Sequence, residues 1–161
     1  MQVTRGSLAR NRRGRKPTRR SGCPVSMALE IFGDRWSLLI VRDVMVRGYR
    51  TFQEFLQSGE GIASNVLAER LKRLRAAGIL TAERAAGDGR KICYQLTQKG
   101  IDLAPAVLEI FLWSAKYEPT AAPSAVVDRM AQHREQILQE VRRRWAAKDP
   151  TPVLPRFGAA R

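Results

Sequence analysis

Three local signals follow one another between residues 51 and 97, and together they limit the folds that this chain can adopt. Residues 51–54, Thr-Phe-Gln-Glu, have the spacing of a capping box, in which the Thr and Glu side chains each bond to the backbone at the other's position. They predict the start of a short helix. Two glycines within residues 58–61 predict a turn. A longer helix is then predicted over about 63–77, where leucines recur at helical spacing on one face.

A β-hairpin is predicted directly after this helix. Residues 79–84 and 90–97 read as strands, and Gly87-Asp88-Gly89 between them tolerates the positive φ of a tight turn. The side chains expected to face inward are those of Ile92, Tyr94 and Leu96. Helix, turn, helix and hairpin in this order are typical of a winged helix-turn-helix, which places its second helix in the major groove of DNA. The predicted fold is therefore mainly α, with a small β-hairpin wing over about residues 79–97.

Positive charge is concentrated at the start of the chain. The formal net charge is +14, and eight of the 29 Lys and Arg residues lie within residues 1–22, which contain no acidic residue. The rest of the chain carries a net charge of +6. Because Lys and Arg that neutralise phosphates release condensed counterions, this charge favours a polyanionic partner. A basic protein that is merely soluble is the alternative. We interpret residues 1–22 as a disordered basic arm.

Further helices are predicted on both sides of the motif. Two precede it, at about 25–32 and 35–47, the second capped by Asp34. A helix from about residue 97 to 117 follows the hairpin and is expected to bend near Pro105. The predicted divisions of the chain are a winged helix-turn-helix domain over 23–117, a C-terminal dimerisation helix over 118–147 and a disordered Pro-rich tail over 148–161.

An ordered set of short motifs resembles a known family. The motifs are Cys23-Pro24-Val25, Gly33-Asp34-Arg35-Trp36, Gly61-Ile62, Val66-Leu67, Arg70-Leu71, Leu74, Gly78, Tyr94-Gln95-Leu96-Thr97 and Gly100. In this order they resemble the HxlR-type winged helix-turn-helix transcriptional regulators, over about residues 23–117. The resemblance implies a bacterial homodimer that binds double-stranded DNA, dimerised through its N- and C-terminal helices. It also implies that a cysteine before the first helix, here Cys23, senses reactive small molecules. Ala63 and Ala68 stand where many members carry Ser or Thr, so the operator sequence does not follow from the resemblance.

The residues expected to contact DNA lie on the helix over 63–77 and at the tip of the wing. Ser64 and Asn65 at the helix start are placed for base edges, since Asn makes a bidentate contact to adenine. Basic residues further along the helix are expected on phosphates, as are those at the hairpin tip. These basic residues are Lys72, Arg73, Arg75, Arg90 and Lys91. Arg70 lies at the edge of the apolar face, so it either contacts DNA or forms an internal ion pair with an acid such as Asp34.

Cys23 precedes a predicted helix and follows Arg19 and Arg20, and both features favour the reactive thiolate. It is therefore a candidate for redox or electrophile sensing, and a small buried residue is the alternative. The last helices carry more apolar surface than one domain needs, which favours a two-fold interface over intramolecular packing. The candidate interface residues are Leu103, Val107, Ile110, Phe111, Trp113, Val127, Met130 and Leu138.

Other classes of function receive no support from the sequence. It shows no nucleophile–base pair, metal-spaced cluster or phosphate-binding loop, so we expect no enzyme, metal or cofactor. Arg42 and Asp43 interrupt the longest apolar run, and a cytoplasmic location is expected. The predicted function is a homodimeric, sequence-specific transcriptional regulator, most simply a repressor, on a pseudo-palindromic operator. A winged helix used for protein–protein assembly, without sequence-specific DNA binding, is the alternative.

Overall fold

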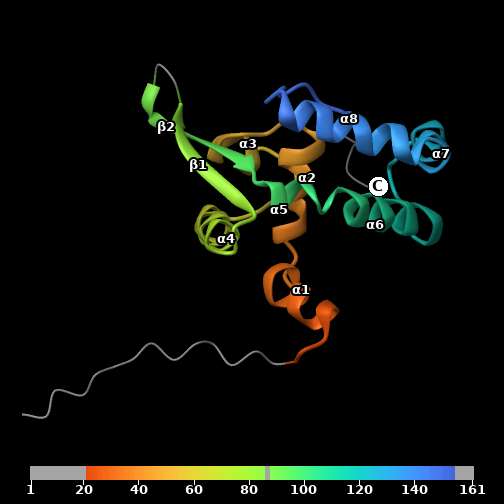
Figure 1. The fold of residues 1–161 in the computed structure, drawn as a ribbon, viewed down its shortest axis with the longest axis horizontal. Coiled ribbons are helices and arrows are strands. Elements are labelled where there is room, and N and C mark those ends of the chain that lie inside the picture. Colours follow the sequence, from red (N-terminus) through yellow and green to blue (C-terminus); the bar gives the residue numbers. More distant parts are fainter. Residues whose placement is uncertain (1–20, 86–87, 155–161) are drawn as a thin grey trace, which may run out of the picture.

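The computed structural model describes residues 21–85 and 88–154, and it shows a helical body from which a two-stranded hairpin projects (Figure 1). The elements are α1 (Pro24–Phe32), α2 (Ser37–Val46), α3 (Phe52–Leu56), α4 (Ser64–Ala76), β1 (Leu80–Ala85), β2 (Asp88–Leu96), α5 (Gln98–Ile101), α6 (Ala104–Tyr117), α7 (Ser124–Gln132) and α8 (Arg134–Ala146). The mainly α fold with a hairpin wing is thus confirmed. Nearly all of the basic arm predicted over 1–22 lies outside the described residues.

The helix boundaries follow from local side-chain signals. Thr51 Oγ1 accepts from the backbone N–H of Glu54, and the Glu54 carboxylate accepts from that of Thr51 at 2.8 Å, which is the predicted capping box. Asp34 accepts from the backbone N–H groups of Trp36 (2.8 Å) and Ser37 (3.0 Å) and so caps the start of α2. Gly78 ends the α4 turn at φ +70°, a conformation that a side chain disfavours.

The core is formed where α2, α4 and the base of the hairpin meet. Val41 of α2, Phe55 of α3 and Leu67 of α4 are each at most 1% exposed. The strands pair in antiparallel register, with Leu80 opposite Leu96. Two of the three residues expected to face inward, Tyr94 and Leu96, are buried, but Ile92 is 45% exposed. The prediction for Ile92 was wrong: its pair with Arg84 lies nearer the tip than those of Tyr94 and Leu96, in a hairpin that projects from the helical body (Figure 1).

The C-terminal part of the chain folds back over α6 (Figure 1). One C-terminal helix was predicted within residues 118–147, but the structure has two, α7 and α8, separated at His133 (φ −119°, ψ 37°). Both pack on α6 and on each other. The bend expected near Pro105 is a break between α5 and α6, because Pro105 occupies the first turn of α6, where its missing N–H costs no helix bond.

Residues 148–154 follow a defined path along α2, although disorder was predicted over 148–161. The Val153 N–H donates to the Val46 carbonyl at 2.8 Å, and Arg144 Nη1 donates to the carbonyls of Thr151 (2.8 Å) and Pro152 (2.7 Å). Gly48 permits the close approach, since an added Cβ would lie 1.8 Å from the Pro150 carbonyl oxygen. Hydrogen bonds to helical neighbours therefore order this segment, while residues 155–161 lie outside the described part.

Candidate nucleic-acid interface

Helix α4 has one buried face and one exposed face. Leu67, Leu71 and Leu74 are buried against the core, at 2% exposure or less. The exposed face carries Ser64, Asn65, Lys72 and Arg75, four of the residues predicted to contact DNA. Neither Lys72 nor Arg75 has an ion-pair or hydrogen-bond partner among residues 21–85 and 88–154. Their charges are thus available to an external anion.

The sequence allows Arg70 either to contact DNA or to form an internal ion pair, and the structure shows the ion pair. Its Nε lies 3.0 Å from Asp34 Oδ1, an ion-pair distance, although the N–H does not point at the oxygen. Its Nη1 also contacts the carboxylate of Glu69. Burial would raise the pKa of Asp34, but hydrogen bonds from Ser37 and from the Trp36 N–H, together with the charge of Arg70, lower it. Arg70 therefore ties α4 to the start of α2, and its guanidinium is engaged within the chain.

Arg73 has a contact that the sequence did not predict. Its Nη2 donates to the Glu30 carbonyl oxygen near the end of α1, at 3.1 Å, and its Nε lies 3.9 Å from the Glu69 carboxylate. Cations near the C-terminus of a helix interact favourably with its unpaired carbonyls. Because Arg73 and Glu30 lie 43 positions apart, only the tertiary structure reveals the pairing. Arg73 thus joins the candidate reading helix to α1.

The wing places its basic residues beside the helix-turn-helix. Arg90 and Lys91 are exposed on β2, the strand that continues from the hairpin tip. The base of the wing is fixed to the chain before α3, because the Tyr94 N–H donates to the Arg50 carbonyl at 2.7 Å. Burial alone would raise the pKa of Glu54, but hydrogen bonds from Arg50 and Thr51 lower it. The positive charge of Lys91 lowers it further. This part of β2 therefore lies close to α3, the first helix of the helix-turn-helix.

Cys23 is exposed at the position directly before α1. Hydrogen bonds from the backbone N–H groups of Ser26 and Val25 lower the pKa of the Cys23 thiol. Cys93 is half-buried on β2 opposite Glu83, and both cysteines are free thiols. No group of His, Cys, Asp and Glu able to hold a metal occurs among the residues that the structure describes.

The candidate dimer residues divide into three groups. Ile110 and Trp113 are exposed, at 50% and 59%. Leu103, Val107, Phe111 and Val127 are half-buried. Met130 and Leu138 are buried inside the protomer, at 2% and 9% exposure, which corrects their assignment to an interface. They lie on the inner sides of α7 and α8, which pack on α6, so for these two residues the intramolecular alternative holds. The missed apolar residues Val25, Leu29 and Tyr117 are also exposed, on α1 and α6.

Comparison with known proteins identifies this arrangement. The model of the HxlR-like helix-turn-helix family matches residues 31–122, more than half of the chain. The chain belongs to this family. It is similar to the uncharacterized HTH-type transcriptional regulator Rv3095 of Mycobacterium tuberculosis, with 35% identity over 98 residues. That match covers 61% of this chain and 61% of the relative, so the chain spans under two thirds of the length of such mycobacterial relatives. The HTH-type transcriptional regulator YodB of Bacillus subtilis is 31% identical over 59% of this chain and 85% of its own.

Solved structures agree with the family assignment. The redox regulator HypR in its oxidized form is similar with a TM-score of 0.53 and 30% identity, over 60% of this chain and 98% of HypR. The reduced form of YodB is similar with a TM-score of 0.50 and 30% identity, over 59% of this chain and 93% of YodB. Fold and sequence thus agree on the HxlR-like helix-turn-helix family, and these relatives are named as regulators. None of the helices in the described part is long and apolar enough to cross a membrane.

Proposed function

We propose that this protein is a homodimeric, sequence-specific repressor of transcription that reads the major groove with α4 and grips the flanking backbone with its wing. One observation carries the proposal: the exposed face of α4 combines Ser64 and Asn65 at the helix start with unpaired Lys72 and Arg75 further along. Short polar side chains at a helix start reach base edges, whereas basic residues along its flank neutralise phosphates. Arg90 and Lys91 extend this positive surface onto the wing.

The test of base reading is binding to duplex DNA from the protein's own promoter region, followed by fluorescence anisotropy. In the dimer, Asn65→Ala removes two bidentate base contacts of about 1–3 kcal/mol each, so it is expected to weaken specific binding about 30-fold or more and to leave binding to unrelated DNA unchanged. Ala76→Ser is a control on the exposed face near the helix end. Equal discrimination between the two DNAs by Asn65→Ala and the parent would exclude α4 as the reading helix and favour the assembly alternative.

Dimerisation is supported by apolar side chains that the protomer leaves exposed. Val25 and Leu29 of α1 are 68% and 59% exposed. Trp113 and Tyr117 of α6 are also exposed, with their ring centroids 5.7 Å apart. Two such helices per protomer suit a two-fold interface, which sets two copies of α4 one turn of DNA apart. Leu29→Glu with Trp113→Glu is expected to give a monomer in sedimentation-velocity analysis. A parent that is itself monomeric at the concentrations that saturate DNA would contradict the dimer.

Cys23 is proposed to modulate DNA binding. Its thiol is exposed, its pKa is lowered by two backbone N–H groups, and similar structures include a redox regulator in its oxidized form. The helix that follows Cys23 is held to α4 by the contact of Arg73 with Glu30, which offers a physical link between thiol and reading helix. An oxidant or quinone is expected to lower operator affinity in the parent and in Cys93→Ser but not in Cys23→Ser. The same response in all three proteins would remove this proposal.

A further inference from the structure

A largely apolar cavity of about 490 Å³ lies between α2, α6, α7 and α8. Leu39 of α2, Phe111 of α6 and Leu138 of α8 contribute to its walls, and Val153 and Leu154 close it from the chain end. Its volume falls within the range of about 300–1,000 Å³ typical of sites for small molecules. The match to the family ends at residue 122, so α7, α8 and the chain end, which supply much of this wall, lie beyond it.

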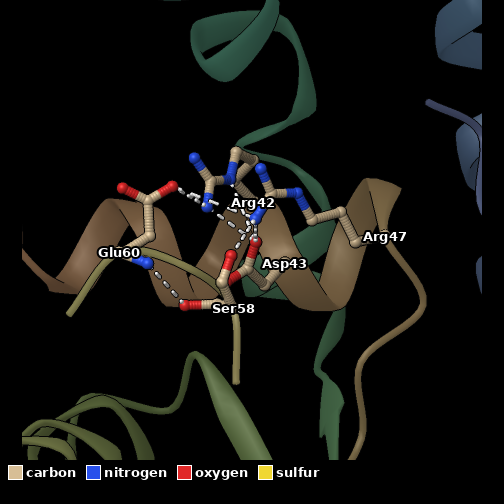
Figure 2. Close-up of polar contacts among 5 residues, drawn as sticks. All are labelled: Arg42, Asp43, Arg47, Ser58 and Glu60. Atoms are coloured by element: carbon tan, nitrogen blue, oxygen red, sulfur yellow. Dashed lines mark hydrogen bonds and ion pairs between the residues drawn. The ribbon is translucent and has the colours of Figure 1, made fainter. Parts of the chain in front are cut away.

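The charged residues of the cavity wall are Arg42, Arg47 and Glu60, which meet beside Asp43 (Figure 2). Asp43 Oδ1 accepts from Arg42 Nε at 3.0 Å, from Arg42 Nη2 at 2.8 Å and from Arg47 Nη1 at 3.0 Å. Arg42 Nη2 also donates to Glu60 Oε1 at 2.9 Å. Asp43 itself is buried and does not line the cavity. The wall therefore presents two guanidinium groups and one carboxylate to whatever occupies the space.

Several donors of these guanidinium groups are unused. Arg42 Nη1 and the Nε and Nη2 atoms of Arg47 have no hydrogen-bond partner among the residues that the structure describes. Guanidinium donors in this fork geometry match a carboxylate, and such bonds are stronger where apolar walls exclude water. We propose that the cavity binds a small carboxylate with an apolar chain, whose head group takes the unused N–H groups of Arg42 and Arg47 while the chain fills the space between the helices.

The charged end of the cavity is connected to the turn before α4. Glu60 and Ser58 lie in that turn, and Arg47 Nη1 lies 3.4 Å from the Ser58 carbonyl oxygen, which it contacts as a donor (Figure 2). A ligand carboxylate on these N–H groups repels the nearby Glu60 carboxylate and so weakens the Arg42–Glu60 contact, which ties α2 to this turn. This effect rests on the proposed function, because it matters only if α4 reads DNA. The site would then be an effector site whose occupancy changes operator affinity.

The binding site itself is tested without DNA, by isothermal titration calorimetry of the full-length protein with decanoate and with uncharged decan-1-ol. Decanoate is expected to bind at least about tenfold more tightly than decan-1-ol. Ala115→Phe fills the wall on α6 and is expected to weaken decanoate binding about tenfold or more, since excluding two methylene groups alone has that effect. Ala106→Phe is the matched control, because Ala106 is exposed on the same helix and does not line the cavity.

The head-group contact has its own variant. Glu60→Gln removes the carboxylate that repels the ligand's head group and is expected to tighten decanoate binding about two- to fivefold, with no change for decan-1-ol. No binding of decanoate to the parent, equal binding to Ala115→Phe and Ala106→Phe, or equal affinity for acid and alcohol would each overturn the proposal. A third outcome would also overturn the proposal. If Ala115→Phe, but not Ala106→Phe, both loses decanoate binding and associates more weakly as a dimer, the cavity instead receives a second copy of the chain.

The regulatory step is read separately, as the operator affinity of the parent with and without saturating decanoate. A change of fivefold or more in the parent that is absent in Ala115→Phe supports an effector site. Calorimetric binding with unchanged operator affinity would retain the ligand site and overturn its regulatory role. A parent that binds decanoate but no DNA would contradict the proposed function and leave the ligand site standing.

Discussion

The salt dependence of DNA binding gives the sharpest test of the exposed face of α4. Lys72 and Arg75 project from this face without a partner in the described part of the chain, so each is assigned one phosphate. Each phosphate contact contributes about −0.9 to the slope of log affinity against log salt. Lys72→Ala with Arg75→Ala removes four contacts from a dimer and should therefore make the slope shallower by about 3.6. Between 50 and 200 mM salt, the parent should lose about 150-fold more affinity than this double variant.

The assay is fluorescence anisotropy of a labelled duplex from the protein's own promoter region, at several KCl concentrations within that range. Arg129→Ala with Arg142→Ala is the matched control. It removes the same charge from exposed positions on α7 and α8, helices that pack on α6. An unchanged slope in the α4 variant, or the same change in both double variants, would refute the assignment of these phosphates. In that case the positive charge acts through the net field of the protein and not through α4.

Three further predictions concern stability, each measured by urea unfolding. Leu71→Ala should lower the free energy of unfolding by about 2–5 kcal/mol, because this side chain is 2% exposed; a loss no larger than that of Ala68→Gly would contradict its place in the core. Trp145→Phe should cost about 0.5–1.5 kcal/mol, since it removes the indole N–H that donates to the Leu96 carbonyl at 2.8 Å, and Trp113→Phe, on an exposed surface, should cost less. The pKa of Asp34 is lowered, so its stabilising contribution is complete above its ordinary pKa of 3.8 and is lost as the pH falls through the folded-state value. The difference between the parent and Asp34→Asn should therefore shrink in acid, and a difference independent of pH would exclude this linkage.

Local signals predicted the elements that position the interface. The capping box at Thr51 and Glu54, the Asp34 cap of α2 and the buried leucine face of α4 each depend on residues within a few positions of one another. Sequence patterns report such short-range preferences directly. The order of helix, turn, helix and wing could therefore be predicted before any tertiary contact was known.

The features that the sequence did not predict depend on contacts between residues far apart in the chain. Arg73 was assigned to phosphate alone, yet its guanidinium contacts the Glu30 carbonyl, a partner with no sequence signature. Met130 has the apolar character of an interface residue, but it is buried when α7 folds onto α6. Three prolines in the last segment are typical of disorder, yet Gly48 leaves room for that segment beside α2. In each case the deciding neighbour is remote in the chain.

The buried residues of α7 and α8 show that the apolar interior extends further along the chain than the match to the family. The family match ends at residue 122, but Met130, Ile137 and Val141 complete the apolar interior that begins in α2 and α6. A fragment cut at the edge of the shared segment would expose that interior to water. The segment that the family model matches and the segment that encloses one apolar interior are therefore different lengths of polypeptide.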